Sequence, residues 1–170
     1  MPRDWKQRDG MKPRTYTNSL LACCVAALIV LCTLSISQPL RFDHERQHRE
    51  TAVKQRLVEI RRAQTAYRHA HHRYCADWAT LIREGFLADP MQYIPYTDNK
   101  RFRMTATVIT TASGRAVPVM ECGAYYTDYL DGMDRRQVVT LMREAGMAGN
   151  YPGLKIGDLI IPNDNAGNWE

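Results

Sequence analysis

One stretch near the N-terminus constrains this chain more than any other, because residues 20–36 form an apolar run of 17 residues without a charge. At 1.5 Å per residue, a helix of this length is near the lower limit for crossing a hydrocarbon core of about 30 Å. Residues 37–40 are also uncharged and can extend the run. We therefore predict a transmembrane helix over residues 20–40, preceded by a basic cytoplasmic tail over residues 1–19.

The processing and orientation of this segment leave alternatives open. Ser35-Ile36-Ser37 has the small-x-small form of a signal-peptidase site, in which case the run would be a removable h-region. Five Lys or Arg residues flank the run on each side, so the positive-inside rule does not orient it. We expect a cytoplasmic N-terminus, because a short tail before one apolar segment is the form of an uncleaved signal anchor. The predicted location is the inner membrane, single-pass, with a periplasmic or extracytoplasmic C-terminal domain.

The remaining chain has the length and composition of one modest α+β domain. Residues 41–87 are expected to form a helical spine and a short second helix, and residues 88–170 a small α/β-sheet region that completes the domain. A helix should begin soon after Pro39, since apolar side chains then recur in steps of three or four. This stripe consists of Val53, Leu57, Ile60, Ala63, Tyr67, Ala70 and Tyr74. Asp77 is a good N-cap for a second helix that Gly85 can end.

Alternating residues predict strands in the second half of the domain. Residues 101–109 and 116–124 read as an antiparallel hairpin with a turn at Ser113-Gly114, and residues 154–161 read as a last strand. Between them, Asp134 can cap a helix that runs to Ala145 and stops at Gly146. The predicted fold is therefore α+β, with a long amphipathic spine packed on a small antiparallel sheet.

Residues 56–67 with Arg73-Tyr74, Leu81-Ile82 and residues 85–87 resemble the corresponding part of pilin-like and pseudopilin-like proteins. The ending, residues 151–157 and Ala-Gly-Asn-Trp-Glu at 166–170, also looks like uncharacterised envelope proteins of the Bacteroidetes type. The resemblance implies a membrane anchor that continues as a helical spine, with a structural role in a secretion or surface-appendage assembly. A prepilin also carries a small residue at its processing site and a Glu at the fifth apolar position. Neither occurs around residues 19–24, so a conventional pilus fibre is not expected.

Charge distribution separates two hypotheses about partners. Between Arg41 and Tyr74 there are nine Lys or Arg and four Asp or Glu residues, a difference of +5 that equals the excess of the whole chain. The leading hypothesis is a non-enzymatic envelope subunit whose partners are the membrane and like subunits or other envelope proteins, with no small-molecule substrate and no nucleic acid. The alternative is a membrane-tethered cytoplasmic domain that binds nucleic acid or anionic lipid through this basic helix. The candidate interaction face consists of Arg56, Arg61, Arg62 and Arg68.

Few residues suggest chemistry. Cys75 and Cys122 are a candidate disulfide across about 47 residues, worth roughly 3–4 kcal/mol in the chain-entropy model, and two free thiols are the alternative. No cofactor is expected, although Asn163, Asp164 and Asn165 are a weak calcium candidate. His69, His71 and His72, like His44 and His48, fit a solvated helix better than a metal site. No catalytic motif is evident, and we predict that the chain is not an enzyme.

Overall fold

The computed structural model describes residues 14–111 and 114–170, with side chains from residue 17 onward except those of residues 34–39. The chain divides into two compact units, Met1–Arg41 and Phe42–Glu170. Most of the predicted basic tail and Ser113 of the predicted turn lie outside the described residues.

The first helix, α1, spans Arg14–His71 and contributes to both units. The sequence predicted a membrane helix that leaves the membrane near Pro39 and continues as the helical spine, and one run of helical backbone passes through this position. Within the described part of the chain, none of the helices combines the length and the apolar character needed to span a membrane. The transmembrane part of the fold prediction is therefore not confirmed, and residues 34–39 of the predicted span have side chains outside those described.

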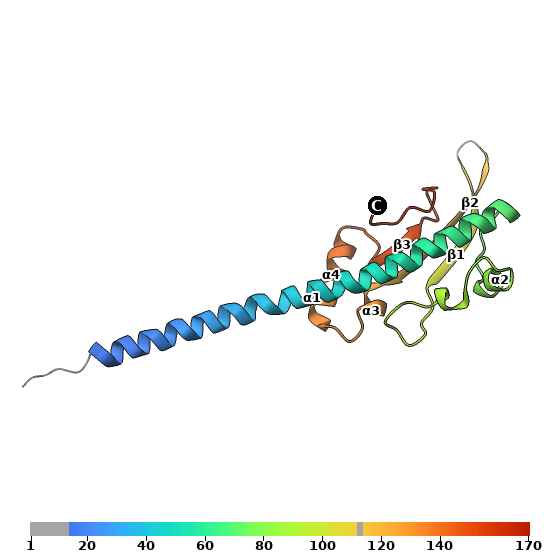
Figure 1. Ribbon diagram of the computed structural model, residues 1–170. Helices are drawn as coiled ribbons and strands as arrows, with labels where there is room; N and C mark the ends of the chain where they lie inside the picture. Colours follow the sequence, from blue (N-terminus) through green and yellow to red (C-terminus); the bar gives the residue numbers. More distant parts are fainter. Residues whose placement is uncertain (1–13, 112–113) are drawn as a thin grey trace, which may run out of the picture. The chain divides into compact units, whose positions relative to one another are not determined.

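The second unit is α+β, with helices on a small antiparallel sheet, as predicted. Strands β1 (Arg103–Thr110), β2 (Ala116–Tyr125) and β3 (Gly153–Gly157) lie in the order β1-β2-β3. β1 pairs with β2 from Arg103–Gly123 to Thr110–Ala116, and β2 pairs with β3 from Glu121–Gly157 to Tyr125–Gly153. In Figure 1 the C-terminal half of α1 runs across this sheet.

The core lies between α1 and one face of the sheet. Leu57 and Ile60 are completely buried and Tyr67 is almost so, which places the predicted apolar stripe against the sheet. The same cluster contains alternate residues of β2 and β3, namely Met120, Cys122, Ala124, Leu154 and Ile156. A stripe of period 3.6 and a strand face of period 2 each supply one apolar surface, so joining them removes both from water.

Short elements connect these parts. The predicted N-cap is confirmed for α2 (Trp78–Arg83), where the Asp77 carboxylate accepts hydrogen bonds from Ala79 N–H and Thr80 N–H. After α2, a 3-10 turn, η1 (Asp89–Gln92), was not anticipated, because its residues read as a loop. Similarly, α3 (Tyr126–Tyr129) is a single helical turn that follows β2 directly and carries no periodic signal.

Two boundaries differ from the sequence prediction. Helix α4 (Arg135–Met147) begins after the predicted cap Asp134 but runs through Gly146, and the left-handed glycine is Gly149, with φ of 67°. Strand β3 ends at Gly157, also left-handed with φ of 73°, so residues 158–161 are not strand. Positive φ is cheap only for glycine, which explains why each of these elements ends where it does.

Candidate functional site

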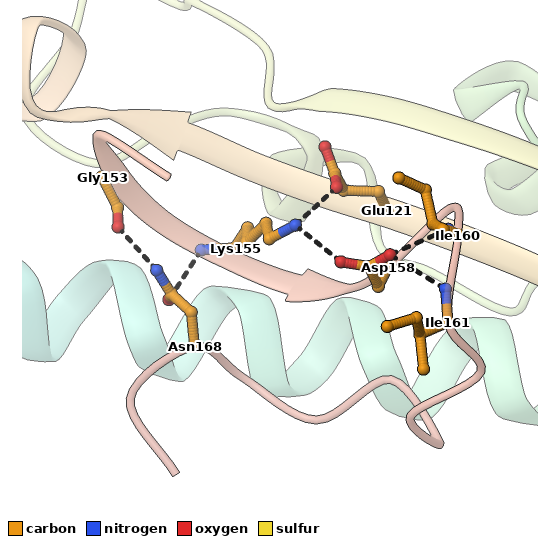
Figure 2. Close-up of polar contacts among 7 residues, drawn as sticks. All are labelled: Glu121, Gly153, Lys155, Asp158, Ile160, Ile161 and Asn168. Carbon is orange, nitrogen blue, oxygen red and sulfur yellow. Dashed lines mark hydrogen bonds and ion pairs between the residues drawn. The ribbon is translucent and has the colours of Figure 1, made fainter. Parts of the chain in front are cut away.

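The outer edge of β3 is closed by the end of the chain, residues 163–170, which we call the C-terminal strap. Asn168 carries much of this closure: its side chain donates to Gly153 C=O (2.9 Å) and accepts from Lys155 N–H (3.1 Å), as Figure 2 shows. Its backbone N–H donates to Lys155 C=O, and Gly157 N–H donates to Ala166 C=O, both at 3.0 Å. One asparagine therefore satisfies three backbone groups, as a paired strand would.

The strap also binds α1. Arg61 donates to both carboxylate oxygens of Glu170, at 2.8 and 3.0 Å. The Asn165 amide donates to the Tyr74 hydroxyl at 2.9 Å, and both side chains are buried. Nearby, the ammonium group of Lys54 lies 5.8 Å from the ring centre of Trp169. The strap thus joins the spine to the sheet edge across more than 90 residues of sequence.

A cluster of charges stands beside the strap on the sheet (Figure 2). Lys155 lies between two carboxylates, 2.7 Å from Glu121 and 3.2 Å from Asp158. Burial alone would lower the pKa of Lys155, but the hydrogen bonds to these carboxylates outweigh it and raise the pKa above its usual value. Asp158 also accepts from the N–H groups of Ile160 and Ile161, which lower its pKa, ahead of the effect of Lys155. This turn holds two isoleucines at the surface, exposed by 81% and 67%.

A buried carboxylate braces the start of β1. Asp128, in α3, is 1% exposed at its side chain and is paired with Lys100 and Arg103. It also accepts from Tyr125 N–H at 3.1 Å. Burial raises the pKa of Asp128, but the hydrogen bond from Lys100, that from Tyr125 and the charge of Arg103 together lower it below its ordinary value. The group therefore remains ionised and ties α3 to β1.

The first unit differs from the second in what α1 exposes. Each of the consecutive residues Leu28, Ile29, Val30 and Leu31 is more than half exposed. At 100° per residue, four consecutive positions cover all sides of a helix. The large apolar residues that are exposed in this part of α1 are Leu20, Leu21, Val25, Leu28, Ile29, Val30, Leu31 and Leu40. A helix that is apolar all round is ordinarily buried in a membrane or a protein interior.

The predicted arginine face has two kinds of members. Arg61 is held by the strap, and Arg56 donates to the C=O groups of Pro90 and Tyr93. Arg62 is 72% exposed and paired with Glu59, whereas Arg68 is exposed and donates to the Tyr74 hydroxyl. Two of the four guanidinium groups therefore brace the fold, contrary to the outward placement expected for all four.

The calcium candidate lies at the start of the strap. Asp164 and Asn165 are both left-handed, with φ of 52° and 57°, and Ala166 N–H donates to Asn163 C=O at 3.0 Å, so the segment is a turn. Arg61 lies 3.4 Å from Asn165 C=O, which places a cation beside the oxygens that would bind calcium. Nowhere in the described residues do three His, Cys, Asp or Glu side chains gather as a metal would require.

Two of the histidines, His48 and His71, contact other side chains of the fold. His71 contacts Glu84 at 2.9 Å and stacks on Tyr67, with ring centres 4.2 Å apart. His48 lies 3.1 Å from the Tyr96 hydroxyl. His72 is left-handed, with φ of 58°, and follows the last residue of α1. His71 and His72 therefore lie at the C-terminal end of α1, and the contacts of His71 pack this end against the residues that follow α2.

Of the two alternatives for Cys75 and Cys122, the structure has the free thiols and not the candidate disulfide, and both residues are buried. The Cys75 thiol donates to Asp77 C=O at 3.2 Å, and its backbone is held at both ends by the Gln64 amide. Cys122 lies in the central strand, where burial raises the pKa of its thiol far above the usual range. Each thiol thus behaves as a small apolar group and not as a nucleophile.

Comparisons of the chain with protein-family models, with curated proteins and with solved structures found no match. The role of the C-terminal strap is therefore inferred from the contacts within the chain. Sequence reasoning missed Asn168 and Glu170 as structural residues, because each acts on a distant segment. It missed Asp158 because the residues after it read as a strand, although its partners are local. The Ala-Gly-Asn-Trp-Glu ending, given by resemblance, and the calcium candidate at residues 163–165 were the sequence signals within the strap.

Proposed function

We propose that this chain is a non-enzymatic, membrane-anchored subunit of an envelope assembly, with a pilin-like anchor and spine. The proposed anchor is the segment of α1 over residues 20–40, which contains the uncharged apolar run 20–36, and the α+β unit is the part that contacts other proteins. Its partners are like subunits or other envelope proteins of a secretion or surface-appendage apparatus. The proposed location is the inner membrane, with the N-terminus in the cytoplasm.

The observation that carries this proposal is the exposed apolar surface of α1. Leu28 to Leu31 leave no polar side toward which the helix could face water. At about 25 cal/mol per Å² of apolar surface, leaving such a helix in water is strongly unfavourable. From residue 20 to residue 40 a helix measures about 31 Å, the thickness of a hydrocarbon core. A bilayer is the surrounding that would satisfy all sides at once.

The second unit supports an interaction role in another way. Its spine buries one stripe in the sheet, and its C-terminal strap and ion pairs brace the surface. The spine-on-sheet arrangement is the one implied by the resemblance to pilin-like proteins. The buried thiols and paired histidines are occupied in packing, which favours a structural over a catalytic role.

The basic-helix alternative has less support. A nucleic-acid or lipid surface requires several cations free to reach phosphates. Arg56 and Arg61 are instead committed to contacts within the fold, and Arg62 is neutralised by Glu59. Part of the positive charge of the spine is thus committed to contacts within the domain.

Membrane extraction tests the anchor. In cells expressing the full chain, we expect the protein to remain with membranes after alkaline carbonate treatment and to be released by detergent. Replacing Leu28 by Arg should shift it toward the soluble fraction, because a charge at the centre of a span costs about 2.5–3.5 kcal/mol. The matched control is Ala66→Arg, an exposed position in the C-terminal half of α1.

Topology and partners need separate measurements. A reporter fused after Glu170 should be active outside the cytoplasm, and crosslinking in intact cells should yield covalent products with like subunits or other envelope proteins. Wild-type protein in the carbonate-soluble fraction would refute the anchor. A cytoplasmic reporter signal would favour the basic-helix alternative, and a purely monomeric crosslinking pattern would refute the assembly role.

A further inference from the structure

The outer edge of β1 is an open strand edge. The hairpin closes with a hydrogen bond from Thr111 N–H to Arg115 C=O at 2.9 Å. Antiparallel pairs alternate, so the backbone groups of Met104, Ala106, Val108 and Thr110 face away from β2. Among the described residues, no further segment hydrogen-bonds to the backbone of these four. Val108 is 58% exposed, and Thr105, Thr107 and Thr110 are also exposed.

The other edges of the same sheet are protected. The strap covers β3, where Asn168 occupies the outward backbone groups of Gly153 and Lys155. The part of β2 that extends past β3 carries Pro118, which pairs with Val108 and therefore turns its nitrogen away from β1. Proline at such an edge prevents another strand from pairing. β1 has no proline or lysine and no interruption of its register over eight residues.

Charge around the hairpin restricts what can pair there. From residue 100 to residue 120 the sequence contains four cations and no carboxylate. Lys100 and Arg103 share the Asp128 carboxylate, whereas no ion pair holds Arg101 or Arg115 in the described structure. Arg101 lies two residues before β1, and Arg115 lies across the hairpin turn, where its C=O accepts from Thr111 N–H. The middle, from Met104 to Thr110, is uncharged and rich in β-branched residues.

This charge pattern argues against a second copy of β1. An antiparallel self-pairing that uses all four outward residues is centred on Thr107. It would bring a second Arg101 and a second Arg115 to the same ribbon, and residues 100–120 contribute no carboxylate to pair with them. Like charges gathered in this way oppose the pairing.

We propose that the outer edge of β1 is a strand-addition site for an extended segment of another protein, uncharged and β-branched in its middle and acidic at both ends. Backbone hydrogen bonds to Met104, Ala106, Val108 and Thr110 would supply affinity, and Arg101 and Arg115 would select the acidic ends. The proposal describes the partner of the interaction subunit proposed above and rests on that function for its setting.

A designed peptide tests the site with the full chain in mild detergent. The probe is a fluorescent peptide with five alternating threonine and valine residues between two pairs of acidic residues. We expect saturable binding by anisotropy, slower hydrogen exchange at the four outward amides, and weaker binding as salt is raised. Val108→Pro should weaken binding by about tenfold or more, because it removes an outward donor and blocks its neighbour. Val108→Thr, which keeps the donor, should bind within about twofold of the wild type.

The charges have matched controls. The double variant Arg101→Gln, Arg115→Gln should bind more weakly and with a flatter salt dependence, whereas Arg143→Gln on α4 should not change binding. A peptide with lysine ends, or one methylated at alternate backbone nitrogens, should lose binding to the wild type. The methylated peptide decides the backbone contribution even if Val108→Pro does not fold.

Four results would overturn the proposal: no protection of the outward amides at about 1 mM peptide, equal binding of the lysine-ended or methylated peptide, unchanged binding by folded Val108→Pro, or an unchanged salt dependence in the double arginine variant. None of these depends on the anchor. Carbonate extraction of the same wild-type protein reports on the anchor separately, so failure of the edge and failure of the proposed function are distinguishable.

Discussion

Replacing Asn168 by Ala tests whether a single side chain closes the edge of β3. The substitution removes the donor to Gly153 C=O and the acceptor for Lys155 N–H but leaves the bond from Asn168 N–H to Lys155 C=O. Because Gly153 is buried, its carbonyl group would lose a partner that water does not readily replace. The strap should then hold the sheet edge through two backbone hydrogen bonds, that of Ala166 with Gly157 and that of residue 168 with Lys155.

The expected loss of stability in Asn168→Ala follows from the environments of the two hydrogen bonds that are removed. A net hydrogen bond contributes about 1 kcal/mol, and a buried acceptor left without a partner costs about 1–3 kcal/mol. Lys155 N–H is the more accessible of the two groups and can recruit water. We therefore expect a loss of about 2 kcal/mol, or a fall in Tm of about 6–10 °C for a unit of this size.

Two measurements check the reasoning in the full chain. Near-ultraviolet circular dichroism reports the Tm, and hydrogen exchange should accelerate at Lys155 N–H while Ile156, which pairs with Cys122 in β2, stays protected. The matched control is Asn150→Ala, an exposed asparagine whose side chain makes no hydrogen bond within the described residues. Equal Tm losses in the two variants, or an unchanged exchange rate at Lys155, would refute the role assigned to Asn168.

The remaining predictions concern the core, acid stability and the thiols. Ile60→Ala should lower the free energy of unfolding by about 2–5 kcal/mol, whereas Arg62→Ala should change it by about 0.5 kcal/mol or less; equal losses in urea titrations would contradict the buried stripe. Because the pKa of Asp128 is lowered by folding, its contribution is present above the unfolded value of about 3.9 and is lost as pH falls through the folded pKa. Asp128→Asn should therefore destabilise the protein at pH 7, and the difference from the wild type should shrink as pH falls below about 3.9 and through the folded pKa. Cys75 and Cys122 should each react with a thiol reagent only after unfolding, in samples prepared without reductant, and a bridged pair in native protein would contradict the free thiols.

The bracing charges show how the same residue types serve different purposes along one helix. Arg61 binds Glu170 of the strap and Arg56 donates to the C=O group of Tyr93, which follows η1, whereas Arg62 is exposed. Their positions in sequence differ by only one to six residues, and all three read alike as a basic helix face. What distinguishes them is the segment that folds against each position.

Local interactions account for what the sequence by itself determined. The stripe from Val53 to Tyr67 repeats with the period of a helix, so its burial was predictable. The Asp77 cap and the hairpin of β1 and β2 were predictable for the same reason, since partners in a cap or a hairpin lie a few residues apart or alternate in register. The uncharged run of residues 20–36 likewise stands out without any structure.

Contacts between distant segments were decided only by the tertiary structure. Arg61 and Glu170 are separated by 109 positions, and Asn165 and Tyr74 by 91, so no periodicity links them. The extent of β3 was overestimated because residues 158–161 are as apolar as a strand, yet Asp158 takes their backbone donors into a turn. The state of Cys75 and Cys122 was equally undecidable, since pairing depends on the relative position of two thiols, and both are free in the structure. Sequence patterns record how a segment meets its own neighbours, whereas the strap, the free thiols and the open edge of β1 depend on which segments meet across the fold.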